Sequence, residues 1–316
     1  MWNIDVDRRT FVLVAAGAAL ASCRTPSRVA VAADFESELA ELERGGRLGV
    51  AVLDTADGTV RGRRQDERFA LCSTFKLVLA ALVLERAAAG GPALATPLRF
   101  GSNDVIAHAP VVGAAMEAAT ARGASVAELT LGELAEAIQT RSDGAAANLL
   151  LREIGGPAAL NAFCRANGDG ATRLDRYEPQ MNDVRPGDPR DTTTPRAMAG
   201  LVARLFGGVL APTTRRTLRE WMIATRTGEA RVRRGLPTTW IAGDKTGTGG
   251  GDGVTVKCND VVWMEPPGRA PLVAAVYYDT GVVAEWPSAA DEEVLAEVGR
   301  AVARAYGRSD GARGPG

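Results

Sequence analysis

The segment from Lys76 to Ala88 most constrains how this chain can fold. Nearly every residue in it is Leu, Val or Ala, and a helix that is apolar on all sides has to be buried. The segment therefore predicts a central helix. Ser73 lies three residues before Lys76, so the two side chains share one helix face. At a helix N-terminus, the Ser73 backbone N–H is free to bind an anion.

Lysine is rare in this chain, and its placement is informative. Only Lys76, Lys245 and Lys257 occur, whereas 34 of the 37 basic residues are arginine. A guanidinium cannot release its proton, but a desolvated ammonium can, and a serine needs a base before it acts as a nucleophile. Lys76 is thus a candidate base for Ser73, provided that burial and the nearby Lys245 lower its pKa.

Composition excludes several classes of protein. The net charge of −1 offers no basic excess for nucleic acid, and no apolar run reaches the roughly 18 residues of a membrane span. His108 is the only histidine, so a zinc site built on two or three histidines is impossible. The cysteines contain no Cys-x-x-Cys pair; they are Cys23, Cys72, Cys164 and Cys258. We expect no metal and no cofactor.

The N-terminus has the pattern of a targeting segment. Residues 7–13 resemble a twin-arginine export signal, an apolar stretch too short to span a membrane follows, and residues 20–23 resemble a lipoprotein cleavage box ending at Cys23. We expect residues 1–22 to be a signal peptide, Cys23 to be lipidated and 23–33 to be a tether. The product would be a periplasmic or cell-envelope protein.

The remaining chain predicts one domain over residues 34–308, followed by a disordered tail at 309–316. Apolar strands are expected at 48–54, 59–64, 240–248, 254–264 and 272–279, and helices at 35–43, 76–88, 129–140, 145–153, 195–206, 212–225 and 291–306. Strands near both chain ends indicate one sheet (about 34–70 and 222–308) with a helical part inserted (about 71–221). Residues 171–191 form a long loop without periodicity, which is usually functional.

Four short motifs follow one another along this pattern. They are Ser73-Thr74-Phe75-Lys76, Ser142-Asp143-Gly144, Glu178-Pro179-Gln180-Met181-Asn182 and Lys245-Thr246-Gly247-Thr248. Their order and spacing resemble those of class A β-lactamases, over about residues 35–307. The resemblance implies an α/β (α+β sandwich) fold, with an antiparallel five-stranded sheet flanked by helices and an inserted all-helical subdomain. It also implies an enzyme that hydrolyses β-lactam antibiotics and confers resistance. Nothing in the sequence demands more than a monomer.

The resemblance assigns a role to each matching residue. Ser73 would attack the lactam carbonyl, and the N–H groups of Ser73 and Thr248 would hold the oxyanion. Ser142 would pass a proton to the leaving nitrogen, and Glu178 would activate the deacylating water, which Asn182 positions. Whether Lys76 or Glu178 is the base in acylation stays open. The other implied roles are substrate binding (Lys245, Thr246, Gly247, Thr248) and structural support (Asn148 and the loop clamp Arg176–Asp191), with a cis Glu178–Pro179 bond.

The chain departs from the family pattern at several positions. Gly144 replaces the usual asparagine, whose amide would bind substrate and Lys76, so we expect an altered substrate preference. The glycine-rich stretch 249–259 predicts an extended hairpin beside the site. Arg231 matches an arginine that faces the substrate carboxylate, the alternative being a surface charge. His108 matches a residue at the rim that contacts substrate, the alternative being a solvated loop histidine. Gly249 stands where some carbapenem-hydrolysing relatives have the partner of Cys72, which leaves a free thiol or a Cys72–Cys258 bridge.

Two other functions share this logic. A cell-wall DD-peptidase uses the same serine and lysines but lacks the Glu178 loop, and a penicillin-binding sensor acylates without turnover. Glu178 and Asn182 favour a hydrolase over both.

Overall fold

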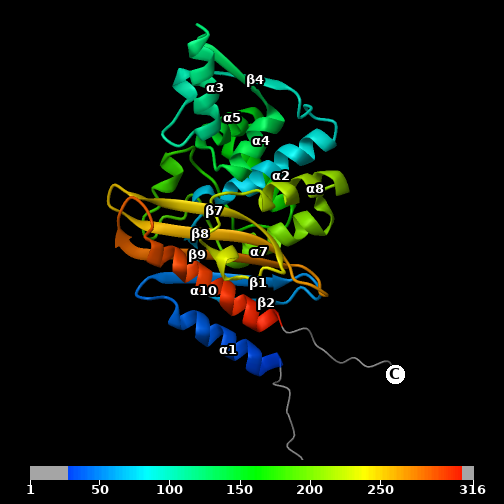
Figure 1. Cartoon of the computed structure of the whole chain (residues 1–316), viewed down its shortest axis with the longest axis vertical. Coiled ribbons are helices and arrows are strands. Elements are labelled where there is room, and N and C mark those ends of the chain that lie inside the picture. The colour runs from blue at the N-terminus through cyan, green and yellow to red at the C-terminus, as the bar shows by residue number, and fades with distance from the viewer. Residues whose placement is uncertain (1–27, 308–316) are drawn as a thin grey trace, which may run out of the picture.

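A five-stranded antiparallel sheet lies at the centre of the molecule (Figure 1). The computed structural model describes residues 28–307, so Cys23, the expected signal peptide and the expected tail lie outside the described residues. The strand order is β2-β1-β9-β8-β7, so both chain ends contribute to one sheet, as predicted. The strands are β1 (Arg47–Asp54), β2 (Val60–Arg63), β7 (Ile241–Gly251), β8 (Val254–Glu265) and β9 (Leu272–Val283).

Both faces of this sheet are buried. Alternate residues of a strand point to opposite faces, and in β9 Val273 and Ala275 pack into one hydrophobic cluster while Ala274 and Val276 pack into another. Helices α1 (Arg28–Glu41) and α10 (Ala289–Tyr306) cover the second face, and α7 (Pro195–Arg204) packs on the first, in the same hydrophobic cluster as α2 (Phe75–Ala88). This sandwich is the predicted architecture.

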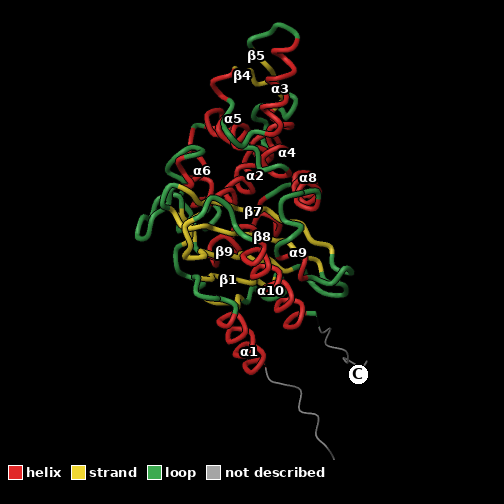
Figure 2. Tube along the Cα trace, turned by 60° about the vertical axis from the view of Figure 1, so that its left-hand side comes forward, coloured by secondary structure: helices red, strands yellow, loops and turns green. Residues whose placement is uncertain are grey.

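The helical part stands on one side of the sheet, with α2 running through it (Figure 2). Ten consecutive residues of α2, Phe75 to Leu84, are buried, which confirms the central helix expected from the apolar run. Around it lie α3 (Pro110–Ala121), α4 (Leu131–Thr140), α5 (Gly144–Ile154), α6 (Gly156–Ala166) and α8 (Pro212–Ile223). Of the helices within residues 28–307, none is both long and apolar enough to cross a bilayer.

Three details of the predicted architecture were wrong or incomplete. The inserted part is not all-helical, because β4 (Pro97–Gly101) pairs with β5 (Val126–Thr130). Helices α3 and α6 were not predicted. Helix α1 begins at Arg28, inside the expected tether, because its first turns are rich in alanine, the strongest helix former. The short elements are β3 (Phe69–Ala70), η1 (Cys72–Thr74), η2 (Ser102–Asp104), η3 (Gln180–Asn182), β6 (Thr192–Thr193), η4 (Leu205–Val209) and α9 (Val232–Gly235).

The glycine-rich stretch forms the extended hairpin that its sequence predicted. Strand β7 continues to Gly251, three residues beyond the expected end, with a bulge between Gly249 and Gly251. Asp252 and Gly253 make the turn, both with positive φ (48° and 77°), which is the combination that a two-residue type I′ hairpin requires. This hairpin extends the sheet at the end where Thr248 lies.

Candidate active site

Ser73 lies in the short helical turn η1, immediately before α2. The side chain of Lys76, in the first turn of α2, donates a hydrogen bond to Ser73 Oγ at 3.0 Å. The i, i+3 spacing therefore brings the two groups together, as predicted. Cys72, the residue before Ser73, has a left-handed backbone with φ +43°. Such a conformation is strained in a non-glycine residue and persists only where the surroundings impose it.

Lys76 is the centre of the site. Its ammonium is 1% exposed and lies 2.9 Å from Glu178 Oε1 and 2.8 Å from the backbone oxygen of Ser142. Together with the bond to Ser73, these contacts occupy all three of its N–H donors. One buried cation thus joins three of the four sequence motifs.

Glu178 is fixed through both its backbone and its carboxylate. Its backbone N–H donates to Asn148 Oδ1 at 3.0 Å, and Asn148 Nδ2 donates to its carbonyl oxygen at 2.9 Å. Asn182 Nδ2 donates to Oε2 at 2.6 Å. Burial opposes ionisation of Glu178, but the Lys76 ammonium and the hydrogen bonds from Lys76 and Asn182 outweigh it and hold its pKa below the usual value. Glu178 is therefore ionised at neutral pH.

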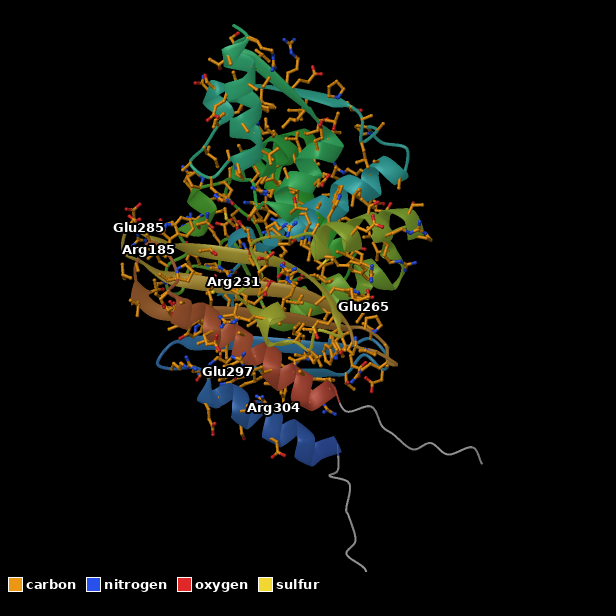
Figure 3. The ribbon with its side chains drawn as sticks, in the orientation of Figure 1. Arg185, Arg231, Glu265, Glu285, Glu297 and Arg304 are labelled. Carbon is orange, nitrogen blue, oxygen red and sulfur yellow. The ribbon has the colours of Figure 1, made fainter. Side chains whose placement is uncertain are left out.

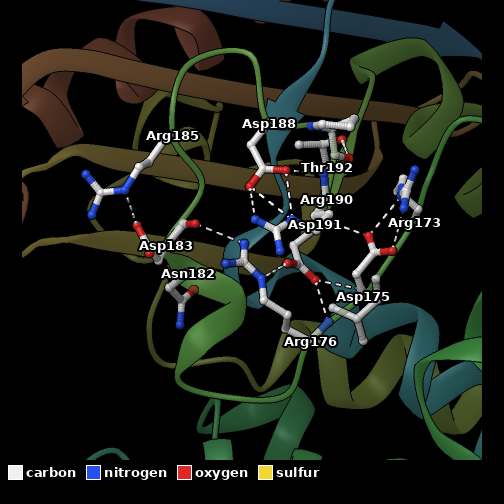
Figure 4. A network of polar contacts seen from close by, with 12 residues as sticks. Arg173, Asp175, Arg176, Asn182, Asp183, Arg185, Asp188, Arg190, Asp191 and Thr192 are labelled. Carbon is white, nitrogen blue, oxygen red and sulfur yellow. Dashed lines mark hydrogen bonds and ion pairs between the residues drawn. The ribbon is translucent and has the colours of Figure 1, made fainter.

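The loop of residues 171–191 carries Glu178, and ion pairs hold its ends (Figure 4). Arg176 Nε lies 2.5 Å from Asp191 Oδ2, and Asp191 Oδ1 accepts from the backbone N–H groups of Asp175 and Arg176. Asp191 is fully buried, so removing its partner would leave an uncompensated charge. The predicted clamp is present, and the Glu178–Pro179 bond is cis, as expected.

Ser142 and Lys245 face each other across the site. Lys245 Nζ donates to Ser142 Oγ at 2.9 Å and to the carbonyl oxygen of Thr246 at 2.8 Å. Burial lowers the pKa of Lys245 well below its usual value, and the charge of Lys76 lowers it further. Ser142 itself has a left-handed backbone, with φ +56°. A hydroxyl held by a lysine with a lowered pKa is suited to passing a proton.

One wall of the site is strand β7, which contains the motif Lys245-Thr246-Gly247. The Thr246 hydroxyl lies 2.6 Å from that of Thr227. Arg231 lies at the sheet (Figure 3). It donates from Nη2 to Thr248 Oγ1 at 2.7 Å and from Nη1 to Gly247 O at 3.0 Å, and it is 4% exposed. The guanidinium thus orients the Thr248 hydroxyl, while its Nε is paired with Glu292 Oε1 at 3.3 Å.

Gly144 and His108 lie against each other at the opposite side of the site. The Gly144 backbone N–H donates to the His108 carbonyl oxygen at 2.7 Å. A Cβ on Gly144 would lie 2.9 Å from Ile106 Cδ1 and 3.1 Å from that oxygen. The loop of Ile106 and His108 therefore fills the space where other residues would have a side chain. The side chain of His108 is exposed to solvent. Its pKa is lowered, first because neighbouring residues partly desolvate the ring and then because of the charge of Lys76.

This close packing predicts a specific coupling. Gly144→Ala should lower the free energy of unfolding by about 1–3 kcal/mol through overpacking. The better helix propensity of alanine offsets at most about 1 kcal/mol of this loss. Ile106→Val removes the clashing Cδ1 atom, so the double variant should be more stable than the two single effects summed. Urea unfolding of the three variants measures this. Gly170→Ala, where a Cβ would have no neighbour within 4 Å, is the matched control. Simple additivity would contradict the account.

Two supporting residues were not assigned a role from the sequence. The fully buried Asp143 accepts hydrogen bonds from the backbone N–H groups of Val111, Val112 and Ala146, and so ties the start of α3 to the start of α5. Aspartate before a helix is a recognisable cap signal, so that half of its role could have been predicted. Thr227, which bonds Thr246, has no such signal.

The cysteines of the described chain are free. Cys72, Cys164 and Cys258 are buried thiols, so the Cys72–Cys258 bridge that the sequence left open does not form. A Cβ on Gly249 would lie 2.9 Å from Cys72 Sγ, which places these two positions side by side. Burial raises the pKa of the Cys72 thiol to about 12, so it does not compete with Ser73 as a nucleophile.

Comparison with known proteins agrees with this geometry. A model of the Beta-lactamase enzyme family matches residues 33–306. Beta-lactamase L2 of Stenotrophomonas maltophilia is 42% identical over 297 residues, which cover 93% of this chain and 91% of that protein. The carbapenem-hydrolyzing beta-lactamase KPC of Klebsiella oxytoca is 44% identical over 238 residues, which cover 75% of this chain and 77% of that protein.

Solved structures show the same fold. An ancestral (GNCA) class A β-lactamase superposes with a TM-score of 0.79 at 48% sequence identity, covering 86% of this chain and all of that one. Sequence and fold thus agree over nearly all of the described residues. The chain belongs to the class A β-lactamases.

Proposed function

We propose that this protein hydrolyses the β-lactam amide bond through an acyl-enzyme on Ser73 and thereby confers resistance to β-lactam antibiotics. One observation carries the proposal: the Lys76 ammonium lies within 3.0 Å of both the Ser73 hydroxyl and the Glu178 carboxylate. A nucleophile, a proton carrier and an ionised base are therefore in direct contact. The names of the relatives support β-lactams as the substrate class.

In acylation, Ser73 Oγ attacks the lactam carbonyl and its proton moves to the base. Lys76 can take this proton if it passes one of its own to Glu178, since it contacts both groups. A bound water can also carry the proton from Ser73 to Glu178. Either route places the proton on Glu178 while the tetrahedral intermediate exists. As the lactam C–N bond breaks, Glu178 returns it through Lys76 toward the Ser142–Lys245 pair, which protonates the leaving nitrogen, so Glu178 is ionised again in the acyl-enzyme. The backbone N–H groups of Ser73 and Thr248 stabilise the oxyanion, for which each donor typically contributes ~3–4 kcal/mol.

The leaving nitrogen receives its proton from Ser142. The hydroxyl of Ser142 accepts a hydrogen bond from Lys245, which can replace the proton that Ser142 gives away. Thr246, Thr248 and the charges of Lys245 and Arg231 bind the substrate carboxylate, with Gly247 allowing close approach of β7. His108 and Gly144 bound the opposite side and contact the acylamino group of the substrate.

In deacylation, Glu178 removes a proton from the water that attacks the ester carbonyl. The ester bond to Ser73 Oγ then breaks, and the proton returns from Glu178 through Lys76 to Ser73, since Lys76 contacts both groups. Asn182 supports this role in two ways. Its Nδ2 orients the Glu178 carboxylate, and its buried Oδ1 has no hydrogen-bond partner among residues 28–307, so it can accept one from the attacking water. A DD-peptidase or a non-hydrolysing sensor would have no use for this arrangement, which is why we favour a hydrolase over both.

The experiment that tests this proposal is hydrolysis of a chromogenic cephalosporin by residues 24–316. We expect multiple turnovers by the parent enzyme and none by Ser73→Ala. The parent alone should gain the mass of the opened lactam in quenched samples. Turnover by a folded Ser73→Ala enzyme would exclude Ser73 as the nucleophile.

We further propose that the protein is exported and tethered to the cell envelope as a monomer through a lipid on Cys23. The support is the N-terminal sequence, with its twin-arginine pattern and the Leu20-Ala21-Ser22-Cys23 box. A tethered enzyme would stay near the entry route of the antibiotic.

Cell fractionation tests the tether. In cells that produce the full chain, activity should be in the membrane fraction, and Cys23→Ser should move it to the soluble fraction. Cys164→Ser, which changes a buried thiol, is the control. A Cys23→Ser protein that stays with the membrane would contradict lipidation.

A further inference from the structure

Asn259 connects the two halves of the oxyanion hole described above. We propose that Asn259 is a positioning residue that sets the separation and orientation of the Ser73 and Thr248 N–H groups, an inference that rests on the proposed function. Asn259 lies on β8, is 1% exposed, and belongs to none of the four motifs.

The side chain of Asn259 holds the turn that carries Ser73. Its Nδ2 donates to the carbonyl oxygen of Ala70 at 2.9 Å and to that of Leu71 at 3.4 Å. The Leu71 oxygen also accepts from Thr74 Oγ1 at 2.7 Å and from the Thr74 backbone N–H at 3.2 Å. Three donors therefore fix the carbonyl at the start of η1, which is more than an ordinary turn requires.

This fixation accounts for the strained residue before the nucleophile. Cys72 has φ +43°, and the direction of the Ser73 N–H follows from the backbone angles of Cys72 because the two residues share a peptide plane. Strained backbone relaxes unless its neighbours prevent it. With the Leu71 carbonyl held, Cys72 stays in the conformation that points the Ser73 N–H at the oxyanion.

The backbone of Asn259 holds strand β7 next to Thr248, whose N–H is the second donor of the proposed oxyanion hole. Asn259 pairs with Gly247 in the ladder between β8 and β7, one residue before Thr248. A Cβ on Gly247 would lie 2.9 Å from Leu71 O and 3.2 Å from Asn259 Cβ, so β7, the turn and Asn259 meet at one point. Arg231 Nη1 donates to the Asn259 carbonyl oxygen at 2.8 Å and fixes the same residue from behind.

The infrared stretching band of the ester carbonyl in the acyl-enzyme tests the proposal. The stretching frequency of an ester carbonyl falls as hydrogen bonds to its oxygen strengthen, so infrared difference spectra report on the oxyanion hole directly. Asn259→Leu, which keeps the volume but loses the donor, should shift this band to higher frequency in a Glu178→Ala background, where the acyl-enzyme persists. In the Glu178 enzyme, we expect acylation to slow by about tenfold, less than the ~10²–10³-fold for loss of a whole donor.

Asn161→Leu is the matched control. Its amide also clamps a backbone segment, donating to Leu174 O and accepting from Leu174 N, but that segment belongs to the loop of residues 171–191 and not to the Ser73 turn. It should lower stability and leave the carbonyl band unchanged. An unshifted band in Asn259→Leu would overturn the proposal, whatever its stability. Failure of the Asn259-intact Glu178→Ala enzyme to acylate would instead count against the proposed function.

A second variant keeps the proposal testable if Asn259→Leu does not fold. Thr74→Val has nearly the same shape and removes one of the three donors to Leu71 O. The band should shift in the same direction by a smaller amount. An unshifted band in this variant would show that the donors on Leu71 O do not set the oxyanion hole.

Discussion

A Glu178→Ala enzyme should form the acyl-enzyme and then stop. Deacylation needs a base beside the ester, and Glu178 is the carboxylate that contacts both Lys76 and Asn182. Positioned general bases contribute about 10²–10⁴-fold, so steady-state turnover should fall by that factor. Acylation should persist at a lower rate, because Ser73 and the oxyanion donors remain and Lys76, once it has lost a proton to solvent, can itself accept the Ser73 proton. Mass spectrometry after mixing with a penicillin should show the enzyme plus one intact substrate mass.

Two further variants separate chemistry from folding in this experiment. Removing Glu178 leaves the buried Lys76 without its counter-charge, which costs about 3–5 kcal/mol in comparable pairs. Glu178→Gln keeps the size of the side chain and one of its two acceptor oxygens, and it should trap the same adduct. Gln180→Ala changes an exposed residue of the same loop and should turn over like the parent. A folded Glu178→Ala enzyme that hydrolysed substrate at the parental rate would exclude the assigned base.

Lys76→Arg should be nearly inactive even though it keeps the positive charge. Lys76 contacts Ser73, Ser142 and Glu178 through one nitrogen, whereas a guanidinium is planar, larger and unable to release its proton. We expect the rate of acylation to fall by about 10²–10⁴-fold. Stopped-flow measurement of the burst phase, with the acylated fraction determined by mass, gives this rate directly.

Lys257→Arg is the matched control for this variant. Lys257 is also a buried lysine on the sheet, 5% exposed, and it is also paired with an acid, Asp279, at 3.1 Å. It has no contact with Ser73 or Glu178 among those described. Lys257→Arg should therefore lose stability but keep its rate of acylation. Equal losses in the two variants would mean that the Lys76 effect is a packing defect.

The sequence predicted the centre of this site because each motif carries its own local signal. The apolar run after Lys76 required a buried helix, and the i, i+3 spacing placed Lys76 beside Ser73. The five strands were predicted to within a few residues because several of their apolar runs end at turn residues, such as Asp57 and Gly58 after the run that forms β1. For Glu178, the family resemblance was needed, since a glutamate before a proline in a loop has no meaning by itself.

What the sequence could not supply depends on tertiary contacts. The pair β4–β5 and helix α3 have weak local patterns, and they are stabilised by packing against α4 and α5. Asn259 gives no sign in the sequence that its amide reaches the turn before Ser73, about 190 residues earlier. The sequence showed that Gly144 lacks the side-chain amide of the usual asparagine. Only the structure shows that Ile106 and His108 occupy the space where that side chain would be.

The central claim is that the chain both acylates and deacylates, and counting product per enzyme tests it most directly. A known amount of residues 24–316 is mixed with an excess of chromogenic cephalosporin, and released product is followed beyond one molar equivalent. The account predicts a steady linear phase that continues for many equivalents, and a single burst from Glu178→Ala. A parent enzyme that stopped at about one equivalent would contradict it and would favour the penicillin-binding sensor or peptidase.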